Sequence, residues 1–218
     1  MKKSETVLIY IILFSVIIFC SFVIYKMAES KKERYNELYS ESTAILDDLG
    51  YGEEFRQTNN LDDSQNSSAS NSSNSNRRSS KSNTERITQE SINAFIRINK
   101  LDIFYPVIEN TTMNNLQIAP TKLWGGDPNT VGNYCVIGHN LENNELFSNI
   151  KTLRVGDTAE LIDLNGNEVQ YSVYNIYQVD ENDLSFTSQN TDGKRELTLV
   201  TCTNHENKRL VIKCQEVL

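Results

Sequence analysis

The chain of 218 residues is poor in the residues that build metal sites and nucleic-acid interfaces. It has only two histidines, and none of its four cysteines is spaced as Cys-x-x-Cys, so a zinc site is poorly supported. Its 21 Lys and Arg are outnumbered by 29 Asp and Glu, which leaves a net charge of −8. Nucleic-acid binding requires clustered positive charge, so the composition predicts no nucleic-acid partner.

Charge, glycine and proline are all absent from residues 7–25, which read VLIYIILFSVIIFCSFVIY. As a helix rising ~1.5 Å per residue, this run can cross the hydrocarbon core of a bilayer. A cleaved signal peptide is the alternative, but its apolar run is usually only ~7–15 residues and ends at a small-x-small site. We therefore expect a retained transmembrane anchor at 7–25, preceded by a short tail at 1–6. The basic residues on its two sides weakly place the C-terminal side in the cytoplasm.

Two segments of different composition separate this anchor from the rest of the chain. Residues 26–56 are charged and predict a helical stalk, because their apolar residues follow a helical spacing. These are Tyr35, Leu38, Tyr39, Ile45, Leu46 and Leu49. Residues 57–86 are mostly Ser and Asn and cannot bury enough apolar surface to offset their ordering entropy. They predict a disordered, flexible linker with a reach of roughly 30 Å.

Residues 87–218 contain short apolar segments typical of an all-β domain. The segments are 94–98, 103–108, 133–137, 158–162, 168–179, 197–201 and 209–217. Asn165-Gly166 precedes an alternating segment and predicts a hairpin turn. Because no βαβ unit is present, a closed antiparallel β-barrel is favoured, with short helices at 112–118 and 144–150. We expect this head to fold without residues 1–84.

Three residues on separate β segments carry the chemistry. Cys202 ends the run Thr198-Leu199-Val200-Thr201-Cys202, His139 follows an apolar segment, and Arg209 begins the last one. A thiol nucleophile, a proton-transferring imidazole and a fixed positive charge for an oxyanion are the parts of an acyl-transfer site. Each residue also has a plainer interpretation, as a buried cysteine, a surface histidine and an edge charge.

Other histidine and cysteine assignments stay open. His205 competes with His139 for the role of acid and base because it lies close to Cys202, although we favour His139, which directly follows a strand. Cys135 and Cys214 are expected to be two buried small side chains, with a disulfide between them as the alternative.

These motifs resemble the sortases, membrane-anchored cysteine transpeptidases of Gram-positive bacteria. The family's TLxTC motif matches residues 198–202, its Gly-His pair matches Gly138-His139, and its strand-initial Arg matches Arg209. The resemblance implies an eight-stranded closed β-barrel and a substrate with a C-terminal sorting signal of the LPxTG type. It also implies Cys202 as nucleophile, His139 as acid and base, and Arg209 as oxyanion and substrate stabiliser.

The resemblance further implies an amine acceptor, either on a peptidoglycan precursor or on a pilin lysine. It places the catalytic domain outside the cell, against the charge count around the anchor. Thr201, beside the nucleophile, is a candidate substrate contact. No cofactor is expected, and a calcium requirement is open because Glu142, Glu145 and Asp183 show no ligand spacing. A cysteine peptidase that releases the acyl group to water, or a non-catalytic module that binds sorting-signal peptides, are the alternatives.

Overall fold

The computed structural model describes residues 3–59, 92–141, 145–203 and 207–217. It begins with two helices, α1 (Lys3–Leu49) and α2 (Gly52–Asn59). Eight strands follow: β1 (Ile92–Ile98), β2 (Ile103–Ile108), β3 (Thr121–Trp124), β4 (Gly132–Ile137), β5 (Thr158–Asp163), β6 (Glu168–Asp180), β7 (Arg195–Cys202) and β8 (Lys208–Glu216). Short helical segments lie between them: η3 (Asn99–Leu101), α3 (Met113–Leu116), η4 (Ile150–Thr152) and η5 (Ser185–Thr187). Most of the predicted linker falls outside the described residues.

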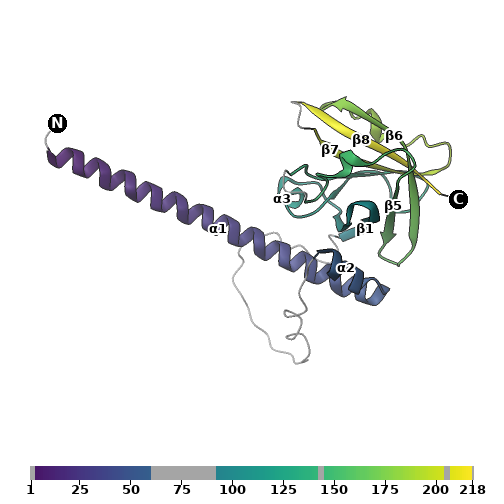
Figure 1. Ribbon diagram of the computed structural model, residues 1–218, viewed down its shortest axis with the longest axis horizontal. Coiled ribbons are helices and arrows are strands. Elements are labelled where there is room, and N and C mark those ends of the chain that lie inside the picture. Colours follow the sequence, from purple (N-terminus) through teal and green to yellow (C-terminus); the bar gives the residue numbers. More distant parts are fainter. Residues whose placement is uncertain (1–2, 60–91, 142–144, 204–206, 218) are drawn as a thin grey trace.

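The strands form a closed barrel in the order β1-β2-β3-β4-β7-β8-β6-β5, which confirms the predicted eight-stranded barrel (Figure 1). Its strand directions differ from the expected antiparallel arrangement. β2 pairs with β3 and β4 pairs with β7 in parallel, whereas the other neighbours are antiparallel. Each parallel pair needs a long connection, which the chain supplies without a βαβ unit: through α3 for the first, and through β5 and β6 for the second.

The barrel interior follows from the alternation of side chains along each strand. In β7, Leu197 and Leu199 point into the interior core, while Val200 belongs to a separate cluster on the outer side with Val211 of β8. The predicted turn at 163–167 is confirmed, with Gly166 at a φ of 80° between β5 and β6. The outer side of β7 and β8 therefore carries a second, smaller apolar cluster.

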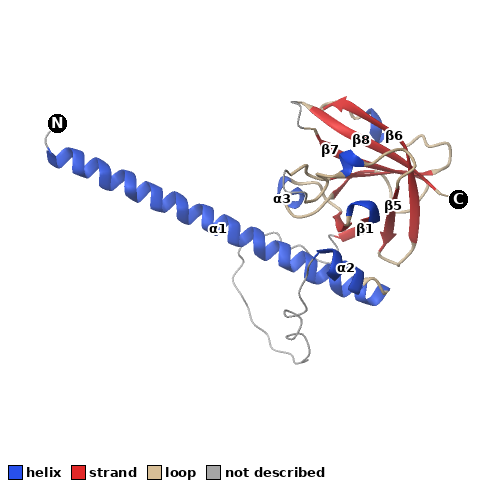
Figure 2. Ribbon diagram, in the orientation of Figure 1, coloured by secondary structure: helices blue, strands red, loops and turns tan. Residues whose placement is uncertain are grey.

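The C-terminal half of α1 packs against the barrel together with α2 (Figure 2). Leu38, Leu46 and Phe55 have no exposed surface, and the ring of Phe55 meets Phe95 and Phe104 edge-on, with centroids 6.4 and 5.3 Å away. The apolar spacing predicted for the stalk is thus the spacing of a buried stripe. The sequence indicated the helix but not its partner.

Charged residues reinforce this contact between α2 and the barrel. Arg97 of β1 bonds to Glu54 of α2 at 2.9 Å, to Glu160 at 2.5 Å and to Glu168 at 2.7 Å. Its guanidinium also lies over the ring of Tyr51, whose hydroxyl donates to Glu168. A planar guanidinium with several donors suits such a site, since it can serve three carboxylates at once.

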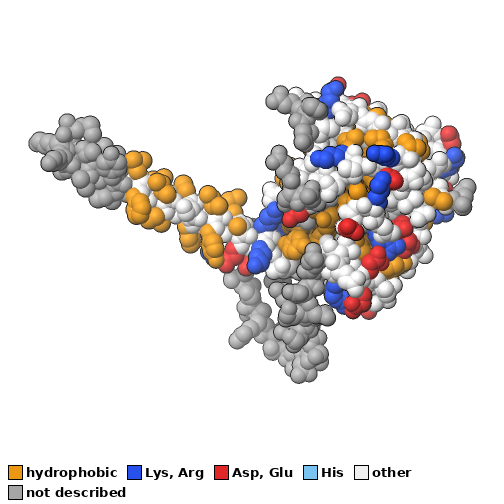
Figure 3. All heavy atoms as spheres, in the orientation of Figure 1, with side chains coloured by type: hydrophobic (Ala, Val, Ile, Leu, Met, Phe, Trp, Pro, Cys, Tyr) orange, Lys and Arg blue, Asp and Glu red, His pale blue; other side chains and the backbone are white. Residues whose placement is uncertain are grey.

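The part of α1 between Ile12 and Met27 is different, because its large apolar side chains are exposed (Figure 3). Among the described residues, α1 is the one helix that is long and apolar enough to cross a membrane. The helix continues without a break from this apolar part to Leu49 and ends before Gly50, whose φ is 85°. The left-handed conformation of a glycine is a common helix stop.

The two short helices expected from the sequence have different outcomes. The one at 112–118 is present as α3, and the Thr112 hydroxyl caps it by accepting from the Asn115 amide. The helix expected at 144–150 is wrong, because residues 146–149 form a bridge and turns and only η4 follows. Leu146 has a φ of 51°, which a right-handed helix cannot contain.

Candidate active site

Cys202 and Arg209 face each other across the β7–β8 hairpin. They are direct partners in the antiparallel register. The Thr203 amide donates to the Lys208 carbonyl at 3.0 Å, so the Cys202–Arg209 pair lies between ladder hydrogen bonds. In such a pair the side chains are closest, with Cβ atoms about 4.5–5.5 Å apart. Cys202 is exposed, and Arg209 is half-buried beside it.

His139 reaches the same level of the sheet from the other side of Cys202. In the parallel β4–β7 pair, Ile137 is opposite Val200, and the Gly138 amide continues the ladder to the Val200 carbonyl at 3.0 Å. Extended by two residues beyond the end of β4, this register would bring His139 level with Cys202. Because β7 lies between β4 and β8, Cys202 is on the strand between the one that leads to His139 and the one that carries Arg209.

Side-chain hydrogen bonds tie the histidine segment to the cysteine strand. The buried Thr201 hydroxyl donates to the Gly138 carbonyl at 2.8 Å, and the Asn140 Nδ2 donates to the Cys202 carbonyl at 3.0 Å. Asn140 was missed by the sequence analysis, and its only signal was its position directly after His139. The Thr201 side chain is turned to the interior side, so its contact in the structure is with the chain itself.

The segment after His139 is held by a ring packed on a glycine. The Phe147 amide donates to the His139 carbonyl, and a Cβ added to Gly138 would lie 2.7 Å from the Phe147 ring. Leu146 adopts its left-handed conformation here and forms a bridge with Asn140. Gly138 is therefore needed for packing beneath the histidine, rather than for close approach of a substrate.

The surroundings of His139 favour its neutral form. Partial burial lowers the pKa of the imidazole, and the positive charge of Lys31 on α1 lowers it further. A neutral imidazole is the form that can accept a proton from a thiol. The effect of Lys31 also indicates that α1 passes close to this end of the barrel.

The four cysteines differ sharply in accessibility. All four are free; Cys202 and Cys20 are exposed, and Cys135 and Cys214 are buried. Burial raises the pKa of Cys135 to about 11 and that of Cys214 to about 12. The thiolate is the reactive form, so Cys202 is the accessible barrel thiol and the other two are inert packing residues, as expected.

An apolar surface adjoins the candidate site on the outer side of the sheet. Val200 and Val211 form a cross-strand pair directly next to Cys202 and Arg209, and Phe186 of η5 covers them. The half-buried Leu123 and Ile137 pack at the edge of this cluster. Val200, Val211 and Phe186 are themselves buried, so only the half-buried side chains at the edge of this cluster are accessible to a bound peptide.

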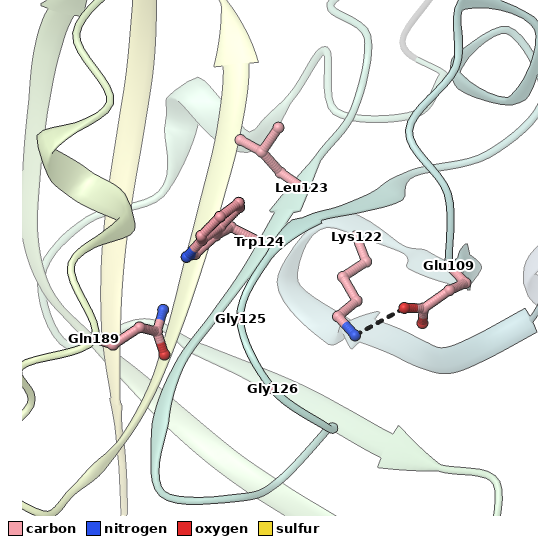
Figure 4. Close-up of a pocket in the computed structure, with 7 residues that line it drawn as sticks. All are labelled: Glu109, Lys122, Leu123, Trp124, Gly125, Gly126 and Gln189. Carbon is pink, nitrogen blue, oxygen red and sulfur yellow. Dashed lines mark hydrogen bonds and ion pairs between the residues drawn. The ribbon is translucent and has the colours of Figure 1, made fainter.

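A pocket of about 370 Å³ lies at the other end of β3 and β4, away from the three candidate residues (Figure 4). Leu123 connects it to the apolar surface, and the exposed Trp124 and Gln189 form one wall. Lys122 and Glu109 face each other across 2.9 Å on the opposite side. It lacks a nucleophile, so the candidate active site is the strand-end surface and not this pocket.

The described residues contain no group of three His, Cys, Asp or Glu side chains arranged to hold a metal ion. Glu142 and His205 lie outside the part of the chain that the structure describes. Asp183 accepts from the Ser185 amide at 2.8 Å and thereby shapes the turn before η5.

A barrel whose adjacent strand ends present cysteine, histidine and arginine has close counterparts among known proteins. The sequence model of the sortase domain matches residues 96–217, more than half of the chain. The chain therefore belongs to the sortase family. A search of curated proteins found no match.

Solved structures agree with this assignment. The sortase D5 transpeptidase of Clostridium perfringens shares 30% identity over 58% of this chain and 79% of its own, with a TM-score of 0.53. Sortase A of Listeria monocytogenes has 24% identity over 59% and 88% of the two chains, with a TM-score of 0.54. Sortase C-1 of Actinomyces oris has 24% identity over 59% and 75%, also with a TM-score of 0.54. These last two likenesses concern the fold.

Proposed function

We propose that this protein is a membrane-anchored cysteine transpeptidase. It would cut an LPxTG-like sorting signal in a substrate protein and join that substrate to an amine. The pairing of Cys202 with Arg209 across β7 and β8, with His139 two residues after the end of the neighbouring β4, is the single observation that carries the proposal. The family assignment supports acyl transfer as the reaction class.

In the first half of the reaction, the Cys202 thiolate attacks the carbonyl carbon of the Thr in the signal. The thiol proton passes to His139, and Arg209 donates hydrogen bonds to the negative oxygen of the tetrahedral intermediate. The C–N bond to the following Gly then breaks, and the His139 imidazolium protonates the departing amine. A thioester on Cys202 remains.

In the second half, an incoming primary amine attacks the thioester carbon. His139 accepts the proton of this amine. The tetrahedral intermediate then collapses: the Cys202 thiolate departs, and a new amide bond between the acyl carbon and the amine nitrogen remains. The acceptor is a peptidoglycan-precursor amine or a pilin lysine. The solved sortase C of Streptococcus pneumoniae has pilin substrate specificity, which supports considering the latter.

Substrate and positioning residues follow from the surface near the thiol. The half-buried Leu123 and Ile137, at the edge of the outer apolar cluster, suit the Leu and Pro that precede the cleaved bond in an LPxTG-like signal. Thr201 acts by fixing the Gly138 carbonyl below His139, and a direct substrate contact of Thr201 stays a prediction. The exposed apolar half of α1 serves as the membrane anchor, with the barrel on the outer side of the membrane where sorting signals are displayed.

The test is mass spectrometry of the full-length protein in detergent after incubation with an LPxTG peptide. We expect a covalent adduct on Cys202 in the absence of amine, and a peptide–amine product when a primary amine is added. Cys202→Ala should give neither, and Arg209→Lys should be severely impaired because Lys lacks the fork of donors. His139→Ala should be nearly inactive and His205→Ala active; the reverse pattern would reassign the base.

Two other outcomes would select the alternatives. Release of the free acid even at high amine concentration would identify a peptidase. Peptide binding that is equal in wild type and Cys202→Ala, without any cleavage by either, would identify a binding module.

A further inference from the structure

The long helix α1 connects the exposed apolar segment directly to the barrel. It is a single helix of 47 residues, with no interruption between its apolar half and its packed half. An unbroken helix of this kind fixes the distance and direction between its two ends, whereas the ends of a flexible linker move freely. The packed half of α1 therefore fixes the position of the barrel relative to the apolar half of the same helix.

The attachment of the barrel to α1 is extensive. Leu38 and Leu46 are fully buried in the shared aromatic cluster, and Asn59 at the end of α2 donates to the Phe104 carbonyl at 2.8 Å. Arg56 of α2 bonds to Asp47 of α1 at 2.8 Å, which locks the two helices together. With the Arg97 ion pairs, these contacts make α1, α2 and the barrel one packed body.

The catalytic end of the barrel lies on the side from which the apolar half of α1 arrives. Arg34 donates to Asn115 of α3 at 3.0 Å. β8 starts at the candidate site and runs away from the apolar half of α1, toward the C-terminus on the far side (Figure 1). The Lys31 charge acting on His139 agrees with this direction.

The length of helix between the apolar segment and the barrel is short. Arg34, the first barrel contact, lies eight residues after Lys26, the first charge beyond the apolar run, which is about 12 Å along a helix axis. The polar headgroup layer on one side of a bilayer is roughly 5–8 Å thick. The near edge of the barrel would thus lie within a few ångströms of the lipid headgroups.

We propose that α1 is a rigid strut that holds the barrel against the bilayer surface, with the end that carries Cys202, His139 and Arg209 turned toward the lipid headgroups. The proposal rests on the membrane anchoring proposed above. The partner surface is the lipid headgroup layer, and the candidate site works at a fixed, small height above it.

Depth-dependent fluorescence quenching on the full-length protein in phosphatidylglycerol–phosphatidylcholine vesicles tests this orientation. In a Cys20→Ser background, a thiol-reactive dye labels the exposed Cys202, because Cys135 and Cys214 are buried. The matched control carries Cys20→Ser, Cys202→Ser and Val217→Cys, which puts the dye at the far end of β8, about 26 Å away at ~3.3 Å per residue. With nitroxide-headgroup lipids, we expect loss of most fluorescence at position 202 and little loss at 217.

A variant with a longer α1 provides the second part of the test. Seven helix-forming residues inserted between Met27 and Ala28 add two turns, or about 10 Å of height. The quenching at position 202 should then fall to near the level at 217, while cleavage of a soluble LPxTG peptide by the unlabelled, cysteine-intact insertion variant should stay unchanged. Equal quenching at 202 and 217 would overturn the orientation, and quenching unaffected by the insertion would overturn the strut.

These readouts are separate from the proposed reaction. Loss of peptide cleavage in the unlabelled wild-type protein, with the quenching pattern intact, would reject the transpeptidase and leave the orientation standing. Normal cleavage with equal quenching at both positions would do the opposite.

Discussion

The two sides of the barrel differ in what their side chains do: one side keeps reactive groups accessible, and the other buries two helices. On the side of β4, β7 and β8, reactive side chains stay accessible at strand ends and are held by backbone and short polar hydrogen bonds. On the side of β1, β2 and β5, aromatic side chains and the Arg97 ion pairs bury the helices α1 and α2. Changes on the first side should act on the reaction, whereas changes on the second should act on folding.

Removal of the helices should have the largest effect on this contrast. A fragment of residues 28–218 keeps the packed half of α1, whereas a fragment of residues 85–218 exposes Phe95, Phe104 and their neighbours. The structure therefore leads us to expect that the shorter fragment aggregates or loses cooperative unfolding, contrary to the expectation from the sequence. Thermal melts of both fragments measure this, and equal melting temperatures would show that the helices contribute no stability.

Phe55→Ala should sharpen the comparison with a single side chain. Phe55 is fully buried between α1 and the barrel, so its loss should lower the free energy of unfolding by about 3–5 kcal/mol. Denaturant unfolding of the 28–218 fragment gives this value. Peptide cleavage well below the melting temperature should stay close to wild type. Met113→Ala, at an exposed position, is the control and should change stability little.

Gly138→Ala should act on the other side. Its Cβ would lie 2.7 Å from the Phe147 ring, so the segment that carries His139 must shift. We expect a stability loss of about 1–3 kcal/mol and a fall in kcat that approaches a hundredfold, since misplacing a catalytic group is costly. Gly126→Ala is the matched control, with its nearest contact at an ordinary 3.4 Å from Thr130. Unchanged kcat in Gly138→Ala would show that the histidine segment tolerates displacement.

Lys31→Gln should have the smallest effect. It links the two sides of the barrel because Lys31 lies on α1 and its charge acts on His139. Removing this charge should raise the pKa of His139 toward its ordinary value. Because the folded state holds His139 with a lowered pKa, the unfolded state binds more protons just below pH 6.5, and stability falls there as the pH drops. This fall should be smaller in Lys31→Gln. Proton NMR titration of His139 measures the pKa, with the exposed Lys32→Gln as control; a lower pKa in Lys31→Gln would contradict the assignment.

Sequence and structure agree where the signal is local. The short apolar segments predicted every described strand except β3. The short strand β3 was missed because its four residues, Thr121–Trp124, contain Lys and Trp and show no apolar alternation. The place of His139 beside Cys202 depends on the parallel β4–β7 pair, which joins distant segments and leaves no local pattern.

The packing of α1 shows a second limit of sequence analysis. The positions of Leu38, Tyr39 and Leu46 indicated an apolar stripe, but a stripe of this kind has the same spacing whether it faces a barrel, another helix or another chain. Its partner depends on the shape of the barrel surface formed by Phe95 and Phe104. The roles of Cys202, His139 and Arg209 in catalysis stay predictions until the adduct and the variants are measured.

The parallel pairing of β4 and β7 also determines when activity can appear during folding. Gly138 and Thr201 are 63 residues apart, whereas Cys202 and Arg209 belong to one hairpin. Contacts between distant segments form slowly because a long loop must close first. The thiol should therefore meet the guanidinium early and the imidazole late, so the three candidate residues come together only after β5 and β6 are in place.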